Sequence, residues 1–255
     1  MPHPRMTKSG TDHVFFPAAL AAFLFITAPP AALAQDNPIL IGAGVRSRPA
    51  YDGSESQRTD IIPVVRYYGR PWFARTTQGI LEGGIRSELA PDFWAGAQLA
   101  YEPGRKQSES SLLASRNAPD LDVGASAGLH LEWDRKLGPL PVTFLVRARQ
   151  HLDRDRGGQA DLRVTAGILE RAGFAAGVFA QATWGSENAV RSMYGAPDSG
   201  LLFVSTGLLG SYDLSRHWVL VASVELRKLF DEASRSPLTE TKTNHYAAAG
   251  VAYRF

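Results

Sequence analysis

The chain has 255 residues, of which 44% are hydrophobic and 20% charged, with no cysteine and a formal net charge of +2 at pH 7. A charge balance so close to zero argues against a polyanionic partner, so we expect no binding of nucleic acid. The lack of cysteine excludes a disulfide framework, a cysteine nucleophile and metal sites that use cysteine.

Residues 1–34 have the order of features that is typical of a secretory signal peptide. Arg5 and Lys8 lie in a polar leader, an apolar stretch follows, and the sequence Ala-Leu-Ala occupies 32–34. An N-terminal membrane helix is the alternative, but the apolar run is short for one. We therefore expect a cleaved signal peptide at 1–34 and an exported domain at 35–255.

After the leader, apolar side chains recur at every second position over segments of about ten residues. In 121–135, for example, Leu129 and Leu131 alternate with His130 and Glu132. Successive side chains of a strand point to opposite sides, so such a segment has one apolar and one polar face. The pattern predicts twelve strands, near 39–47, 59–68, 71–77, 79–88, 92–103, 121–135, 140–151, 159–170, 173–184, 201–213, 217–230 and 244–255.

The length of these segments favours a membrane barrel over a soluble β-sandwich, which also shows alternation. Soluble strands average about five or six residues, whereas a tilted strand that spans a bilayer needs ~9–11. Aromatic residues lie near the ends of the apolar faces, as Phe93, Tyr101, Trp133 and Trp218 do. Aromatic girdles at the two membrane interfaces have this placement.

The links between the predicted strands alternate in length. Links after the second, fourth, sixth, eighth and tenth strands are short, and most of the others are long and polar. Outer-membrane barrels have short periplasmic turns, long extracellular loops and an even number of strands. The tight link near Gln78 breaks this alternation, and if 70–89 is one long strand the count changes. We expect an all-β, antiparallel transmembrane barrel of about twelve strands, with ten as the alternative.

The last predicted strand, 244–255, explains why an alternating run ends on an aromatic residue. In lipid every backbone group needs an internal partner, so the last strand must pair with the first. Gly250, Tyr253 and Phe255 in this strand resemble the carboxyl-terminal signal that the barrel-assembly machinery reads during insertion.

Charged residues on the predicted inward faces are candidates for a role in the lumen. Arg147 and Arg149 alternate on one strand and Arg163 lies on the next, with Glu132 and Asp134 on the preceding strand. Buried charges require pairing, which favours an ion-pair network that fills a narrow barrel. The alternative is a selectivity ring in a pore.

Two regions of the sequence resemble the MipA/OmpV family of outer-membrane proteins. The motif residues near the start are Gly42, Gly44, Pro49, Tyr51, Gly53, Ser54 and Pro63, and those near the end are Asp231, Ser236 and Pro237. The resemblance implies a barrel surrounded by outer-membrane lipid that acts as a scaffold. It also implies a murein transglycosylase and a murein synthase as partners. We expect no cofactor.

A catalytic role finds little support in the residues themselves. Ser126, His130 and Asp134 share one strand face, but residues four apart on a strand are ~13 Å apart at about 3.3 Å per residue. They cannot bond to one another as a triad does. We therefore expect that the protein is not an enzyme and has no metal site. We expect that it acts as a scaffold or interaction protein. A small-solute channel, or a surface adhesin acting through loops 104–120 and 185–200, remains as an alternative.

Overall fold

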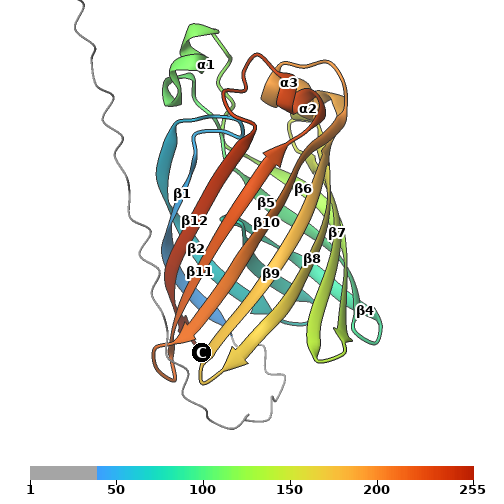
Figure 1. Cartoon of the computed structure of the whole chain (residues 1–255). Coiled ribbons are helices and arrows are strands. Elements are labelled where there is room, and N and C mark those ends of the chain that lie inside the picture. The colour runs from blue at the N-terminus through green and yellow to red at the C-terminus, as the bar shows by residue number, and fades with distance from the viewer. Residues whose placement is uncertain (1–38) are drawn as a thin grey trace, which may run out of the picture. The chain divides into compact units, whose positions relative to one another are not determined.

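Residues 39–255, the part of the chain that the computed structural model describes, form one antiparallel sheet that closes on itself as a barrel (Figure 1). The strands are β1 (Leu40–Pro49), β2 (Gln57–Tyr68), β3 (Trp72–Thr77), β4 (Ile80–Ala90), β5 (Phe93–Glu102), β6 (Gly124–Leu137), β7 (Leu140–His151), β8 (Gly158–Arg171), β9 (Phe174–Gly185), β10 (Gly200–Asp213), β11 (Trp218–Leu229) and β12 (Thr243–Arg254). Each strand pairs with its sequence neighbours, and β1 also pairs with β12. The predicted signal peptide lies outside the described residues.

The predicted twelve-stranded antiparallel barrel is confirmed, and the ten-stranded alternative is wrong. The segment 70–89 is not one strand, because the chain reverses at Gln78 and Gly79, between β3 and β4. Both residues are left-handed, with φ of 51° and 77°, and Thr77 pairs with Ile80 across the turn. A two-residue turn of this kind matches the twist of the strands that flank it, so Gln-Gly ends one strand and begins the next.

The links alternate in length as the sequence predicts. The turns after β2, β4, β6, β8 and β10 are short and lie at the periplasmic end, where Figure 1 marks the carboxyl terminus. The long links lie at the other end and carry the helices α1 (Ser111–Ser115), α2 (Glu187–Tyr194) and α3 (Asp231–Arg235), with 3-10 turns η1 (Gln107–Glu109) and η2 (Arg154–Arg156). None of the helices within 39–255 is long and apolar enough to cross a membrane.

Glycine allows the seam between β1 and β12 to close tightly. Gly42 lies opposite Ala252, and Gly44 lies opposite Gly250. A Cβ added to Gly42 would overlap the carbonyl oxygen of Val251, so only a residue without a side chain permits this approach. Closure matters because an unpaired strand edge in hydrocarbon leaves backbone donors and acceptors without partners.

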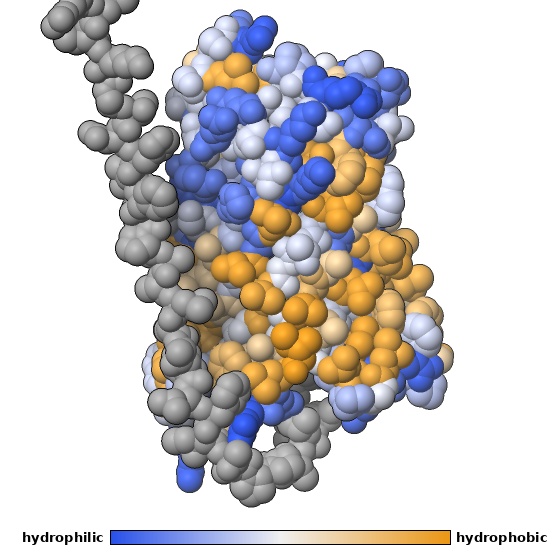
Figure 2. All heavy atoms as spheres, viewed as in Figure 1, coloured by the Kyte–Doolittle hydropathy of each residue, from blue (hydrophilic) through white to orange (hydrophobic). Residues whose placement is uncertain are grey.

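The two faces of the sheet differ as the alternation predicts. Outward-facing Ile61 and Leu129 are 84% and 67% exposed, whereas inward-facing Glu82 and Arg147 are 1% and 4% exposed. Figure 2 shows the consequence on one side of the barrel, where hydrophobic residues cover the periplasmic part of the wall and hydrophilic residues surround the loop end. The apolar surface is thus the lipid-facing wall, and the polar residues fill the lumen.

Candidate functional site

Glu82 of β4 is the centre of a buried group of charges in the lumen. Its side chain is fully buried, and its carboxylate accepts hydrogen bonds from Arg75 Nε and Arg147 Nη1, both at 2.5 Å. Gln98 Nε2 donates a third hydrogen bond at 2.9 Å. Two guanidinium groups therefore neutralise one carboxylate in a place that water hardly reaches.

The ion pairs continue from this carboxylate across the neighbouring strands. Arg147 Nη2 lies 2.8 Å from Asp161, Arg149 Nη1 lies 3.0 Å from Glu102, and Arg75 Nη1 lies 2.6 Å from Glu132. We call these residues the lumen network: Arg75, Glu82, Glu102, Glu132, Arg147, Arg149 and Asp161. Alternating charges fill this side of the barrel and leave no single-signed ring among these seven residues.

The turn between β3 and β4 reaches into the lumen and contacts the opposite wall. Gln78 Nε2 donates to Glu225 of β11 at 2.9 Å, and Arg46 Nη1 of β1 donates to the carbonyl oxygen of Gln78 at 2.6 Å. We call Arg46, Gln78 and Glu225 the lumen bridge. Arg46 and Gln78 line a cavity of about 170 Å³ toward the loops and another of about 340 Å³ toward the periplasm. The bridge therefore separates two halves of the lumen.

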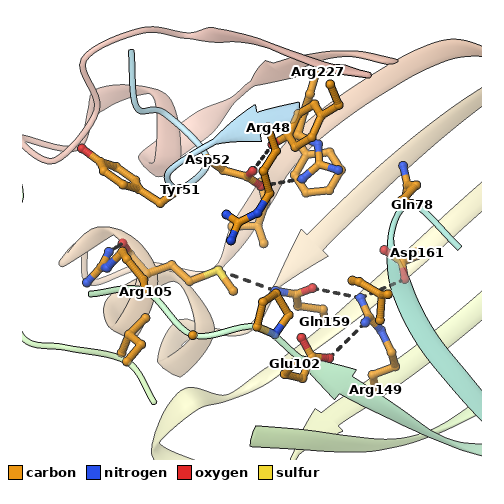
Figure 3. A pocket seen from close by; sticks show the side chains of 18 of the residues that line it. Arg48, Tyr51, Asp52, Gln78, Glu102, Arg105, Arg149, Gln159, Asp161 and Arg227 are labelled. Atoms are coloured by element: carbon orange, nitrogen blue, oxygen red, sulfur yellow. Dashed lines mark hydrogen bonds and ion pairs between the residues drawn. The ribbon is translucent and has the colours of Figure 1, made fainter. Parts of the chain in front are cut away.

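Many charged and polar side chains line the cavity on the loop side, and Figure 3 shows how they lie. Arg227 Nη1 lies 2.6 Å from Asp52, and Arg227 Nη2 lies 2.9 Å from Glu225, so this arginine connects the first loop to the lumen bridge. On the opposite side Arg149 binds Glu102 and Gln159. The cavity can hold several water molecules or a small polar solute, because polar groups surround it.

The first and last long loops bind each other over the barrel mouth. Tyr51 Oη donates to the carbonyl oxygen of Leu238 at 2.9 Å, and Ser54 Oγ donates to Glu240 at 3.0 Å. Asn244 accepts from the amide of Gly53 at 2.6 Å and donates to the carbonyl oxygen of Ser54 at 2.9 Å. We call these contacts of loop 50–56 with loop 230–242 and with Asn244 at the start of β12 the loop clamp.

A hydrophobic cluster supports the clamp from the side of α2 and α3. Val190 and Tyr194 of α2 pack with Leu202, Leu229 and Ala233 of the adjoining strands and α3. Burial raises the pKa of the Tyr194 phenol well above its usual range, which keeps this ring neutral. The helices α2 and α3, which lie above the barrel in Figure 1, are thus packed on its rim.

Loss of the Asn244 side chain is expected to loosen the clamp. Asn244 is 1% exposed, and its replacement by Ala leaves the buried amide of Gly53 without its partner. We expect Asn244→Ala to lower the free energy of unfolding by about 1–3 kcal/mol and to raise protease cleavage within 230–242. Asn188→Ala removes only two exposed hydrogen bonds, one to the carbonyl oxygen of Arg154 and one from Arg191, and should change neither. Equal effects of the two variants would contradict the role of the clamp.

The structure places the motif residues in three regions. Gly42, Gly44 and Gly250 lie at the seam between β1 and β12. Pro63 lies on β2, where its carbonyl oxygen accepts a hydrogen bond from Thr76 Oγ1. The remaining motif residues lie in or beside the loop clamp: Pro49, Tyr51, Gly53, Ser54, Asp231, Ser236 and Pro237. Ser236 Oγ, for example, donates to the carbonyl oxygen of Tyr194 at 2.6 Å. Tyr253 packs between Trp218 and Phe255 at the periplasmic end.

The predicted lumen charges divide into two groups. Glu132, Arg147 and Arg149 belong to the lumen network. Arg163 instead lies 3.8 Å from the centre of the Phe179 ring, and Asp134 accepts from Thr143 Oγ1 at 2.6 Å; within 39–255 neither forms an ion pair. Nothing in the sequence pattern singles out the other four members of the network, although each occupies a polar position in an alternating segment: Arg75, Glu82, Glu102 and Asp161.

The residues Ser126, His130 and Asp134 of β6 do not form a catalytic triad with one another. Ser126 Oγ donates to Glu102, His130 packs edge-on against the Phe73 ring, and Asp134 is bonded to Thr143. Within the described residues no cluster of three or more His, Asp or Glu side chains has the arrangement of a metal site.

Comparison with known proteins supports the barrel and identifies the family. The structure resembles the COG4313 outer membrane channel from Pseudomonas putida F1, with a TM-score of 0.53, 12% identity, and coverage of 90% of this chain and 100% of that one. It also resembles the beta domain of the Bordetella autotransporter BrkA, with a TM-score of 0.45, 13% identity, and coverage of 86% and 100%. At these identities the likeness concerns the fold alone. A comparison with curated proteins gives no significant match. The family model described as MltA-interacting protein MipA matches residues 41–255, and the chain therefore belongs to the MipA family of outer-membrane β-barrel proteins.

Proposed function

We propose that this protein is an outer-membrane interaction protein whose periplasmic rim binds a murein-remodelling enzyme. The observation that carries the proposal is the filled lumen. The lumen network and the lumen bridge occupy the barrel interior, which supports an anchor more than an open pore. The family description, which names an interaction with MltA, supports an enzyme of this class as the partner.

The periplasmic rim offers a place where a partner can bind. An open cavity of about 680 Å³ lies between the turn after β2 and the turn after β4. The guanidinium of Arg70 lies 5.2 Å from the Trp94 ring, and that of Arg86 lies 4.2 Å from the same ring. Leu89, beside them, is 64% exposed. Arginine and tryptophan are enriched at the centre of protein interfaces, and Leu89 adds exposed apolar area beside them.

A pull-down from detergent-solubilised envelopes tests this proposal. The full-length protein should recover a murein transglycosylase or a murein synthase, and Trp94→Ala or Arg70→Glu should reduce recovery by about tenfold or more, as central interface residues do. Arg216→Glu makes the same charge change on the exposed turn between β10 and β11 and should leave recovery unchanged. Recovery of no murein enzyme with the unaltered protein would overturn the proposal.

A small-solute channel is the second candidate. The observation that favours it is the pair of cavities on the two sides of the lumen bridge, because a few side chains separate them. Conductance distinguishes a barrel that is permanently filled from one that opens.

A further inference from the structure

The barrel wall has a cleft beside β2 because β3 is short. β2 pairs with β1 through ten residue pairs but with β3 through only three, from Arg66 opposite Arg75 to Tyr68 opposite Phe73. The loop-side part of β2, 57–65, therefore has no strand partner on this side. An open cleft of about 740 Å³ lies here, lined by β2, the start of β4, the end of β5 and the loop that follows.

Backbone donors and acceptors of β2 face this cleft. Thr76 Oγ1 donates to the carbonyl oxygen of Pro63 at 2.9 Å and accepts from the amide of Val65 at 3.3 Å, so both residues direct their backbone groups to the β3 side. In an antiparallel ladder this direction alternates along the strand, so the backbone groups of Ile61 and Thr59 point the same way. No strand lies opposite Ile61 and Thr59 on this side, so their backbone groups face the cleft.

The outer rim of the cleft is apolar. Ile61, Leu81, Tyr101 and Val123 line it and are exposed by 84%, 38%, 48% and 61%. Tyr101 belongs to the aromatic residues near the strand ends, which mark the membrane interface in barrels of this class. The cleft therefore opens toward the outer half of the hydrocarbon region and its interface.

The inner side of the cleft carries an excess of positive charge. Asp60 is shared by three arginines, with Arg46 at 3.4 Å, Arg48 at 2.5 Å and Arg58 at 2.9 Å. Arg58 also pairs with Glu109. Lys106, at the edge of the cleft, is exposed and has no ion-pair partner within 39–255.

One of these cations has an unused donor. Arg46 is 8% exposed, it lines the cleft, and its Nε has no hydrogen-bond partner among the described residues. A buried guanidinium donor without a partner is costly, and an anionic oxygen in the cleft would reduce that cost.

We propose that this lateral cleft binds an anionic amphiphile with a single alkyl chain, taken from the surrounding membrane. The alkyl chain lies along Ile61 and Leu81 on the apolar rim. The oxygens of the carboxylate or phosphate head group accept hydrogen bonds from Arg46 Nε, Arg58, Lys106 and the amides of β2. The cleft has a net positive charge, which favours an anionic head group. Its lining contains four cations and two carboxylates: Arg46, Arg48, Arg58 and Lys106, with Asp60 and Glu109. The inference is independent of the periplasmic rim and its partner.

A single fluorescent reporter tests the proposal, because the chain has no cysteine of its own. Val123→Cys places an environment-sensitive dye at the cleft, and Val224→Cys places it on exposed β11 as the matched control. The full-length protein in detergent micelles is titrated with hexadecanoate, hexadecyl phosphate and hexadecanol. We expect a saturable response at 123 with one or both anions, about tenfold weaker with the alcohol, and none at 224.

Charge variants complete the test. Lys106→Glu, which loses no ion pair of the described residues, and the double variant Arg58→Gln with Lys106→Gln should each weaken anion binding by about tenfold. The order of affinity between hexadecanoate and hexadecyl phosphate identifies the head group. Three results would overturn the proposal: the same response at 123 and 224, equal binding of the alcohol, or unchanged anion affinity in Lys106→Glu. Each would show that alkyl chains occupy the cleft without recognition of the anionic head group.

Discussion

Replacement of Glu82 by Gln is expected to lower the free energy of unfolding of the barrel by about 3–5 kcal/mol, the range for breaking a buried ion pair from one side. The substitution keeps the size of the side chain but removes the charge that faces Arg75 and Arg147. Two guanidinium groups then share the remaining carboxylates of the lumen network. Urea titration of the refolded protein in detergent, followed by the mobility shift between folded and unfolded barrel, measures the change.

Glu88→Gln is the control for this prediction, because it is the same substitution on the same strand. Within residues 39–255 the only ion pair of Glu88 is with Arg70, whose side chain is 75% exposed, and surface pairs contribute about 0–1 kcal/mol. The two variants should therefore differ by at least about 2 kcal/mol. If Glu82→Gln were as stable as Glu88→Gln, the lumen network would not hold the barrel together.

The second large effect concerns conductance. The unaltered protein should give no discrete current steps in planar bilayers, because the lumen bridge separates the two cavities. Arg46→Ala combined with Gln78→Gly removes two of the three side chains of the lumen bridge, and glycine keeps the left-handed turn possible. This double variant should produce reproducible steps.

Ser223→Ala is the matched control, since Ser223 lines the periplasmic cavity without taking part in the bridge. It should be as silent as the unaltered protein. Steps of equal size in all three proteins would favour the channel over the anchor, and silence in all three would mean that the lumen network alone blocks the barrel.

Sequence periodicity predicts the wall of this protein well and its interior less well. Alternation places β6 at 121–135 and the structure has it at Gly124–Leu137, because lipid on one side and polar groups on the other leave no freedom in which side chains face outward. The same reasoning finds Arg147 and Glu132 on inward faces. It does not say which charges meet across the barrel, since that depends on strand tilt and register.

The missed features arise from contacts between distant parts of the chain. The pattern predicts a short strand at 71–77. It does not predict that this strand pairs only with the periplasmic end of β2, and this limited pairing creates the cleft. Gln78 is visible in the sequence as a tight link, but its contact with Glu225 joins residues 147 positions apart. Pro63, which has no amide donor, is the one local signal that this side of β2 lacks a regular ladder.

The loop clamp also constrains the order in which the molecule assembles. Its hydrogen bonds join Tyr51 to Leu238 and Gly53 to Asn244, separations of 187 and 191 positions. Segments so far apart in the sequence come together only at a large entropic cost unless β1 has already paired with β12. The mouth of a nascent barrel therefore stays uncovered until its wall is complete, and water can reach the arginines inside while they find their carboxylates.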